Sequence, residues 1–323
     1  MSDRVRGRRR RWLCGVPLLA LAVSLAVSGS AFGGAGAAKC GKVVIDENAW
    51  AGASANAYVA KYVLEKNLGC KVEIAKITEG GPVFQAMADG KVDVLLEDWQ
   101  HTDQYKQYVT KGKSVVFAGP LGITGIIGWF IPKYLLEQYP QFATWKGLKG
   151  KETVFKSPES GSQGMFLGGD PSYVQKDRAL IKELGLSFKH VSVGAEPTQI
   201  ARWTQLYKQK KPVIFYWYDP QYLNGKYQVV EVKLPKRFAA CKDDEKASGN
   251  HACSYPRYPL MKLMSTKFAQ SGSPAVAVIK KFQWTRDDQT QVATWIGIDH
   301  VSPDKAAEKW VKANPGKVKA WLG

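Results

Sequence analysis

KVVIDENAWAGASANAYVAKYVLEKNLGCKVEIAKITEGGPVFQAMADGKVDVLLEDW, residues 42–99, is the stretch that decides the fold. Short apolar runs alternate here with segments of helical period, and a glycine ends each helical segment. The expected strands are 42–46, 71–77 and 92–96, and the expected helices are Ser54–Asn67 and Pro82–Asp89. Alternation of this kind is typical of parallel strands joined by helices. The stretch therefore predicts one βαβαβ lobe.

The same alternation returns further along the chain and predicts a second lobe. Its expected elements are the strands 125–131, 188–191 and 212–218 and the helices Tyr173–Leu184 and Pro197–Gln209. Residues 228–234 are interpreted as a returning strand, and helical stretches follow at 276–282, 288–298 and 304–313. We therefore expect an α/β protein of two lobes, with helices flanking the sheet of each. Lobe I comprises 40–120 plus 228–323, lobe II comprises 121–227, and crossings near 119–124 and 223–228 form a hinge.

The first 37 residues carry the features of an export signal. Six arginines precede an apolar run from Leu13 to Val27, and small residues ending in Ala37 follow. This order is typical of a secretory signal peptide. The run is short for a bilayer span of about 20 residues and contains Gly15 and Pro17, which argues against a membrane anchor. We expect cleavage near Ala37 and a periplasmic protein, exported by the general or the twin-arginine route.

Four cysteines lie beyond the expected leader, an even number in an exported chain: Cys40, Cys70, Cys241 and Cys253. Cys40 and Cys70 each precede one of two neighbouring strands, so we expect them to form a disulfide. Cys241 and Cys253 then close a short excursion. Zinc is the rival interpretation, but neither pair has the CxxC spacing typical of zinc sites. No metal and no cofactor is expected.

A net charge of +18 makes the chain basic. The lysines stand singly or in pairs along the expected helices and acidic residues lie between them. The charge therefore indicates a solvated surface and not a nucleic-acid site. With 45% hydrophobic residues and no second apolar span, the chain beyond the leader is able to bury a large core. We expect a soluble monomer that binds no nucleic acid.

Large aromatic residues stand in or directly after the expected strands. They are Trp50, Trp99, Trp129 and the run Tyr216-Trp217-Tyr218. Strand alternation places Trp217 on the face opposite Tyr218, so these two are alternatives for one site. Ligands of open α/β sheets bind at the carboxyl ends of strands, and several ring faces brought together hold a methylated cation. The pattern predicts a site for a quaternary ammonium compound.

Two further features near these rings indicate which groups would contact the charged parts of the ligand. Gly52, Ala53 and Ser54 lie at the start of the first helix, where free backbone N–H groups bind an anion such as a carboxylate. Glu97, two residues before Trp99, brings a negative charge that is able to face a cation. Because the rings recognise only the head group, the sequence leaves open which methylated amine is bound.

Four motifs give these residues a resemblance to a known family. They are WAGASANAYV at 50–59, FQAMADGKVDVLLEDW at 84–99, GWFIPKY at 128–134 and YWYDPQY at 216–222. Over most of residues 40–323 the chain resembles the substrate-binding proteins of ABC importers for glycine betaine, proline betaine and choline. The family often has W-x-P-H-W where this chain has Tyr218-Asp219-Pro220-Gln221-Tyr222, so the family's histidine is replaced by a glutamine.

This resemblance implies a periplasmic-binding-protein clamshell whose two lobes close around the ligand. Carried over by position, Trp50 and Trp99 come from the first lobe, and Trp129 and Tyr218 from the second. The implied partners are a small quaternary amine and an ABC permease in the membrane.

Two other classes of function are weaker interpretations. A secreted hydrolase needs a nucleophile, but SPESGSQG at 157–164 lacks the G-x-S-x-G turn of serine hydrolases. A secreted carbohydrate- or cell-wall-binding protein would also use exposed aromatic residues, usually on a flat platform and not on two lobes. We therefore expect a binding protein and not an enzyme.

Overall fold

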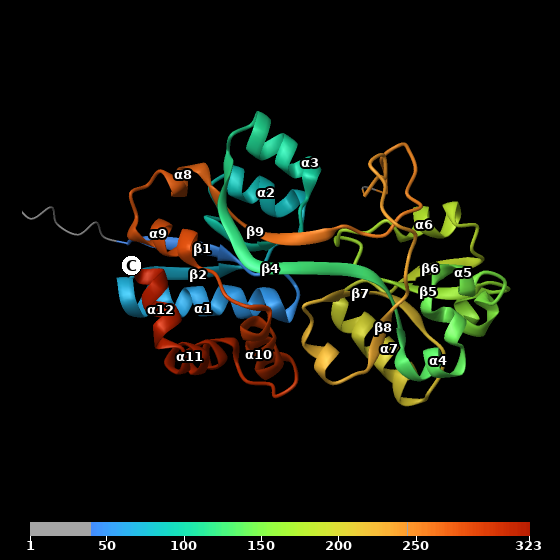
Figure 1. Cartoon of the computed structure of the whole chain (residues 1–323). Helices are drawn as coiled ribbons and strands as arrows, with labels where there is room; N and C mark the ends of the chain where they lie inside the picture. Colours follow the sequence, from blue (N-terminus) through green and yellow to red (C-terminus); the bar gives the residue numbers. More distant parts are fainter. Residues whose placement is uncertain (1–39, 244) are drawn as a thin grey trace, which may run out of the picture. The chain divides into compact units, whose positions relative to one another are not determined.

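The computed structural model describes residues 40–243 and 245–323. The expected leader, residues 1–37, lies outside them. Within the described part, no helix combines the length and the apolarity needed to cross a membrane. Figure 1 shows one sheet running through this part of the chain, with helices packed against it in both of its halves.

The first half of the sheet follows the pattern of residues 42–99. Its elements are β1 (Lys42–Asp46), α1 (Ala51–Leu68), β2 (Lys71–Ala75), α2 (Gly81–Ala88) and β3 (Val94–Asp98). Parallel pairing of β1 with β2 and β3 confirms the predicted βαβαβ unit. α1 begins at Ala51, three residues earlier than predicted, and Ala53, Ala55 and Ala57 in its first two turns are buried between the sheet and two C-terminal helices that pack on α1. Gly69 ends α1 in the left-handed conformation (φ 65°), as predicted.

Two long antiparallel strands join the two halves (Figure 1). β4 (Val115–Pro132) pairs with β9 (Arg257–Ser265), and β9 also pairs with β3. For the described residues the strand order is β2-β1-β3-β9-β4-β7-β5-β6, with β8 (Val229–Glu231) beside the far end of β4. The first predicted crossing, at 119–124, therefore lies within a strand.

The second half is built around parallel pairing of β5 with β6 and β7. Its elements are β5 (Gly164–Gly168), α6 (Asp177–Glu183), β6 (Phe188–Ser192), α7 (Glu196–Lys208) and β7 (Ile214–Asp219). Short helical segments connect these elements and the first half: α3 (Thr102–Gln104), the π-helix η1 (Tyr105–Lys111), α4 (Lys133–Gln138), η2 (Pro140–Ala143), α5 (Trp145–Leu148), η3 (Glu152–Phe155), η4 (Pro158–Ser160) and η5 (Tyr222–Gly225).

Helices at the C-terminal end of the chain complete the first half. They are α8 (Thr266–Ala269), α9 (Pro274–Lys281), α10 (Arg286–Gly297), α11 (Pro303–Ala313) and α12 (Pro315–Leu322). α9, α10 and α11 contact α1, so the chain returns to the lobe in which it began.

The strand that returns is not the predicted one. β8 pairs with the end of β4, and Lys233 bridges Thr144, so residues 229–233 stay in the second half. The returning strand is β9, whose apolar run is interrupted by Pro259 and Lys262 and gives no clear strand pattern. The lobe boundaries 40–120 plus 228–323 and 121–227 remain a prediction. Because residues 119–124 of β4 pair with residues 259–262 of β9, we propose that the second crossing lies there and not at 223–228.

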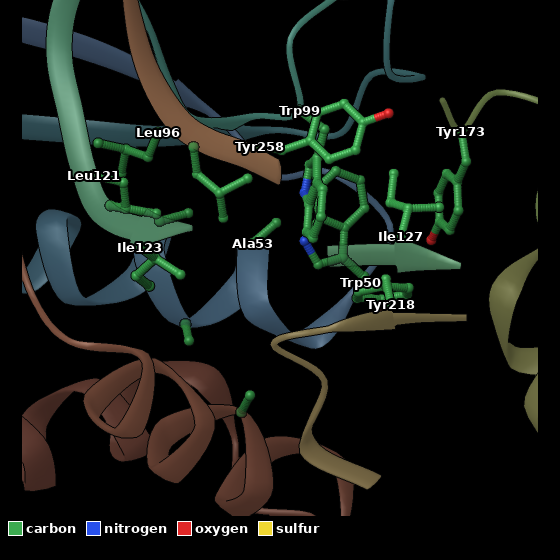
Figure 2. Packing of buried hydrophobic residues seen from close by; sticks show 14 of the residues in the cluster. Trp50, Ala53, Leu96, Trp99, Leu121, Ile123, Ile127, Tyr173, Tyr218 and Tyr258 are labelled. Carbon is green, nitrogen blue, oxygen red and sulfur yellow. The ribbon is translucent and has the colours of Figure 1, made fainter. Parts of the chain in front are cut away.

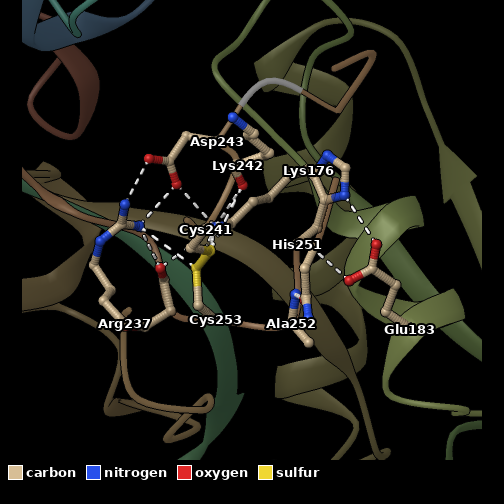
Figure 3. The surroundings of a disulfide bond; sticks show 11 residues. Lys176, Glu183, Arg237, Cys241, Lys242, Asp243, His251, Ala252 and Cys253 are labelled. Carbon is tan, nitrogen blue, oxygen red and sulfur yellow. Dashed lines mark hydrogen bonds and ion pairs between the residues drawn. A yellow bond between two sulfur atoms is a disulfide. The ribbon is translucent and has the colours of Figure 1, made fainter. Parts of the chain in front are cut away.

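The two predicted disulfides are both formed in the structure. Cys40 and Cys70, at the starts of β1 and β2, have Cα atoms 4.9 Å apart, and Cys241 and Cys253 have Cα atoms 6.3 Å apart. Asp243 lies beside the second pair, as in a metal cluster, but sulfurs bonded to each other offer no thiolate to a metal. Figure 3 shows the buried Lys176 ammonium at this position, where it donates to Asp243 Oδ1 (2.8 Å).

A buried lysine fastens β9 to the first half. Lys262 Nζ donates to the carbonyl oxygens of Ile279 (2.7 Å), Lys280 (2.9 Å) and Phe282, at the C-terminal end of α9. These are carbonyls that the end of a helix leaves without a partner. Burial lowers the pKa of Lys262 to about 7.

Candidate functional site

A small cavity lies where the two halves of the sheet meet. Its lining consists of five aromatic side chains, one valine and one carboxyl group: Trp50, Trp99, Tyr173, Tyr216, Tyr218, Val174 and Glu79. The cavity has a volume of about 20 Å³, and roughly 10–15 Å³ is enough for one water molecule. Its lining suits a compact, largely apolar group, and the rings have to move apart to admit one.

Local structure sets the position of each ring. Trp50 is the extended residue directly before α1, and Trp99 directly follows β3. Tyr216 and Tyr218 are alternate residues of β7 and so lie on the same face of the sheet. Tyr173 lies in the turn before α6.

The rings meet across the cavity in two pairs. We call Trp50 and Trp99 the tryptophan side, and Tyr173 and Tyr218 the tyrosine side. The ring centroids of Trp50 and Tyr173 are 5.6 Å apart with an interplanar angle of 86°, and those of Trp99 and Tyr218 are 5.6 Å apart at 79°. Figure 2 shows the two tryptophans with the two tyrosines beside them. All four side chains are more than nine-tenths buried, so a ligand among them would be shielded from water.

Two glycines make room for the rings. A Cβ atom at Gly125 of β4 would lie 2.3 Å from the Trp99 ring, and one at Gly169 would lie 2.6 Å from the Tyr216 ring. Any side chain at either position would displace the ring, so both rings depend on a close approach of the backbone.

Glu97 holds the tryptophan side from behind. It is 2% exposed and does not line the cavity. Its Oε1 accepts from the indole N–H groups of Trp50 and Trp99, both at 2.9 Å. Its Oε2 accepts from the side-chain amides of Asn56 (2.5 Å) and Gln289 (2.6 Å). Burial raises the pKa of Glu97 to about 6 against the effect of these four hydrogen bonds.

Glu196, the first residue of α7, holds the tyrosine side in the same way. It is also 2% exposed. Its Oε2 accepts from the hydroxyls of Tyr173 (2.6 Å) and Tyr218 (2.7 Å), and its Oε1 accepts from the amide of Gln221 (3.1 Å). Burial raises the pKa of Glu196, and these hydrogen bonds oppose the rise. Each side of the cavity thus has one buried carboxylate that fixes two rings.

Glu79 is the carboxyl group of the lining. It is 7% exposed, and its Oε1 lies 3.5 Å from Nε2 of His101, whose Nδ1 lies 2.7 Å from Asp98 Oδ1. Burial raises the pKa of Glu79 to about 8, with nearby acids adding to the rise and His101 opposing it. Burial would lower the pKa of His101, but Asp98 and Glu79 raise it to about 9. Glu79 is therefore able to donate a hydrogen bond when protonated and to face a cation when ionised.

The structure brings three of the predicted ligand residues to this cavity, namely Trp50, Trp99 and Tyr218. The start of α1 does not open to it. Gly52 lines a second, smaller cavity, Ala53 is buried in α1, and the Ser54 hydroxyl donates to Glu47. Anion binding by these three residues remains a prediction.

Trp129 and Trp217 lie away from the cavity, which corrects their expected place in its lining. The indole N–H of Trp129 donates to Asp177 at 2.7 Å and its ring packs on Phe166. Trp217 lies on the opposite face of β7 from Tyr218, as strand alternation predicts, and its ring contacts Trp203 at 5.1 Å. The same alternation that brings Tyr218 to the cavity therefore removes Trp217 from it.

Sequence reasoning missed four residues of this arrangement: Glu79, Tyr173, Tyr216 and Glu196. Tyr216 shares a strand face with Tyr218, and Glu79 follows the strand β2, so both carried the signal used for Trp99. Tyr173 gave no such signal, because it lies in an irregular turn that the pattern assigned to a helix.

Comparisons with known proteins give this geometry a context. The family described as “Substrate binding domain of ABC-type glycine betaine transport system” matches residues 41–313. The chain is similar to a trimethylamine N-oxide-binding protein of Pelagibacter ubique (strain HTCC1062), with 24% identity over 314 residues that span 92% of this chain and 96% of that protein.

Two solved structures share the fold. One is lactococcal OpuAC in its closed-liganded conformation with glycine betaine, with a TM-score of 0.68, 18% identity and coverage of 87% of this chain and 99% of that one. The other is an ABC-transporter choline-binding protein in complex with choline, with a TM-score of 0.68, 16% identity and coverage of 88% and 92%. This likeness establishes the predicted two-lobed α/β fold.

Proposed function

The chain belongs to the family of substrate-binding domains of ABC-type glycine betaine transport systems, and from this premise we propose that it binds a small trimethylated amine in an aromatic cage. The observation that carries the proposal is a single small cavity lined by five rings and one carboxyl group. A cation–ring contact contributes below about 1 kcal/mol when exposed and about 2 kcal/mol when desolvated. Several desolvated contacts reach the roughly 8 kcal/mol that micromolar binding requires.

Closure of the two lobes follows from where the rings originate. The tryptophan side belongs to the first half of the sheet and the tyrosine side to the second, so a ligand between them contacts both. A ligand shifts an equilibrium between open and closed forms only through contacts that differ between them. We propose that the closed, loaded form is recognised by a membrane permease after export of the chain to the periplasm.

The charge of the lining narrows the choice of ligand. Among the described residues, no lysine, arginine or histidine lines the cavity, and its one carboxyl group is Glu79. The carboxylate of glycine betaine would meet no positive charge there. A hydroxyl, as in choline, donates to an ionised Glu79, whereas an N-oxide oxygen accepts from a protonated one. We therefore propose choline or trimethylamine N-oxide ahead of glycine betaine.

Calorimetric titration of residues 38–323 with choline, trimethylamine N-oxide, glycine betaine and glucose tests the proposal. We expect micromolar binding of choline or the N-oxide, weakened roughly 10- to 30-fold by Trp99→Leu, which removes one ring face. The matched control is Trp295→Leu, because Trp295 is half-buried on α10, does not line the cavity and has its ring face covered by Lys309. Its affinity should equal that of the wild type.

Three outcomes of this titration would contradict parts of the proposal. Tightest binding of glycine betaine would contradict the argument from Glu79. Binding of glucose alone would favour the carbohydrate-binding alternative. Equal losses in Trp99→Leu and Trp295→Leu would show that the cavity rings do not hold the ligand. The pH trend separates the favoured ligands, since ionisation of Glu79 above about 8 strengthens choline binding and weakens N-oxide binding.

A further inference from the structure

Glu97 and Glu196 share an arrangement that packing alone does not require. Neither lines the cavity, yet in each carboxylate one oxygen accepts from two cavity rings and the other from side-chain amides. Buried acids are costly unless they are paired or well hydrogen-bonded. Here no lysine, arginine or histidine is among the hydrogen-bond donors to Glu97 or Glu196 in the described structure, so both carboxyl groups are met by neutral groups.

A carboxylate bonded to the edge of a ring changes the face of that ring. Hydrogen bonds to an ionised acceptor are the strong ones, and linked hydrogen bonds polarise one another in a site of low dielectric. An indole N–H or phenol O–H drawn toward a carboxylate leaves more electron density on its ring. Because a cation is attracted by the negative ring face, such a ring holds a cation more strongly. A neutral ligand of the same shape gains nothing from this change.

We propose that Glu97 and Glu196 are positioning residues that give the cavity its preference for a cationic head group, by fixing two rings each and making their faces more negative. This inference rests on the proposed function and deepens it. These two carboxyl groups stay behind the rings, so on the tryptophan and tyrosine sides the ligand meets ring faces, and neither Glu97 nor Glu196 has to lose water when it binds. The rise in the pKa of Glu97 to about 6 leaves it largely ionised at neutral pH.

Tyr218 and Tyr216 provide a matched pair of variants. Both line the cavity from the same face of β7, but the Tyr218 hydroxyl donates to Glu196, whereas the Tyr216 hydroxyl donates to the main-chain carbonyl of Val174 at 3.1 Å. Tyr218→Phe and Tyr216→Phe each remove one hydroxyl and keep the ring. Only the first variant separates a ring from a carboxylate.

The readout is the ratio of affinities for a cation and for its neutral carbon isostere, choline against 3,3-dimethylbutan-1-ol. Trimethylamine N-oxide against tert-butanol is the second pair. We expect Tyr218→Phe to lower the ratio by roughly 3- to 10-fold, through weaker attraction of the cation, and Tyr216→Phe to lower it by less than about 2-fold. Glu196→Gln and Glu97→Gln should lower it at least as far as Tyr218→Phe, and circular dichroism establishes that each variant is folded.

The outcomes are distinct. Parallel loss of affinity for cation and isostere in Tyr218→Phe, or equal changes of the ratio in the two tyrosine variants, overturns the inference and leaves the carboxylates a purely structural role. The tyrosine pair decides the matter even where a Gln variant fails to fold. A wild-type protein that binds cation and isostere alike, or binds neither, instead overturns the proposed function.

Discussion

The tryptophan side and the tyrosine side of the cavity each depend on one buried carboxylate, but the two carboxylates are supported differently. Glu97 accepts four hydrogen bonds, two of them from amides on α1 and α10. Glu196 accepts three, and two of these come from the cavity rings themselves. The tryptophan side is therefore braced by the helices of its lobe, whereas the tyrosine side is held chiefly by the rings that would meet the ligand.

Because of this difference, the contribution of a ring to ligand affinity is distinguishable from its contribution to the stability of the fold. On the tryptophan side a ring is removable while Glu97 keeps three donors, so the loss measures the ring face. On the tyrosine side the removal of one ring also leaves the buried Glu196 with only two hydrogen-bond donors. Such a variant therefore loses free energy of unfolding as well as affinity for the ligand. Variants on the two sides are thus expected to divide differently between affinity and stability.

Replacement of the facing rings Trp50 and Tyr173 should give the largest effect. We expect Trp50→Leu to weaken choline binding by about 30-fold, because tryptophan offers the strongest cation–ring contact, and Tyr173→Leu by about 5-fold. Tyr173→Leu should in turn lower the free energy of unfolding more than its affinity loss suggests, by about 1–3 kcal/mol. Calorimetry and urea denaturation measure the two quantities, and the reverse order of affinity losses would contradict the comparison.

Stability should fall as pH rises, through buried carboxyl groups in both halves of the molecule. Asp46 and Asp177, whose pKa values are raised from 3.8 to about 7, contribute together with Glu79 and Glu97, whereas the lowered pKa values of Lys262 and His190 oppose the trend. The pKa of Glu79 is raised from 4.5 to about 8 and that of Glu97 from 4.5 to about 6, so the folded chain binds protons that the unfolded chain has already released. The free energy of unfolding therefore decreases between about pH 4.5 and 8. His101 acts in the same direction, because its pKa is raised from 6.5 to about 9 and its stabilisation, full below 6.5, is lost as pH rises through 9.

Thermal denaturation of the ligand-free protein across this range checks the trend. Glu79→Gln should flatten the curve above about pH 6, by roughly 1 kcal/mol or more, since one pKa unit corresponds to about 1.4 kcal/mol. A midpoint that rises with pH in the wild type would contradict the assigned directions.

The smallest effect on ligand affinity is expected from the ion pair between Arg286 and Asp219, which joins the two halves of the molecule at the surface. Arg286 is the first residue of α10, and Asp219 is the last residue of β7, the strand that carries Tyr218. Arg286 Nε donates to Asp219 Oδ2 at 2.7 Å. Arg286→Met should weaken choline binding by at most about 5-fold, because exposed pairs contribute about 0.2–1 kcal/mol, and high salt should remove the difference. The control is Arg178→Met, because Arg178 and its partner Glu245, which also accepts from the backbone N–H groups of Arg178 and Ala179, both lie at the start of α6 in the second half. Equal effects of the two variants would exclude a role of Arg286 in closure.

Regular backbone explains what the sequence could predict. We expected Trp50, Trp99 and Tyr218 to lie together because each stands near the carboxyl end of a strand with a clear apolar run, and all three line the cavity. Tyr173 was missed because it comes from a turn, where no periodicity reports the direction of a side chain. Glu97 was found as a site residue but with the wrong orientation, since its charge faces the indole N–H groups behind the rings and not the cavity.

The joining strands show the same limit for the fold. β4 was recognised only from Gly125 onward, because its first half alternates glycine and proline with apolar residues. β9 was not recognised at all, because Lys262 at a fully buried position breaks the apolar pattern. Its partners are the carbonyls of a helix end more than a dozen residues later in the chain, a contact that no local pattern predicts.

The attachment of Lys262 to the end of α9 has a consequence for the design of a fluorescent sensor from this chain. Because this side chain fastens β9 to α9, the first half carries its end of the joining strand as a fixed part. Two labels placed on α9 and β2 would keep their separation when ligand binds. A label on α7, in the other half, would change its distance to α9 on closure, so donor and acceptor belong on α7 and α9.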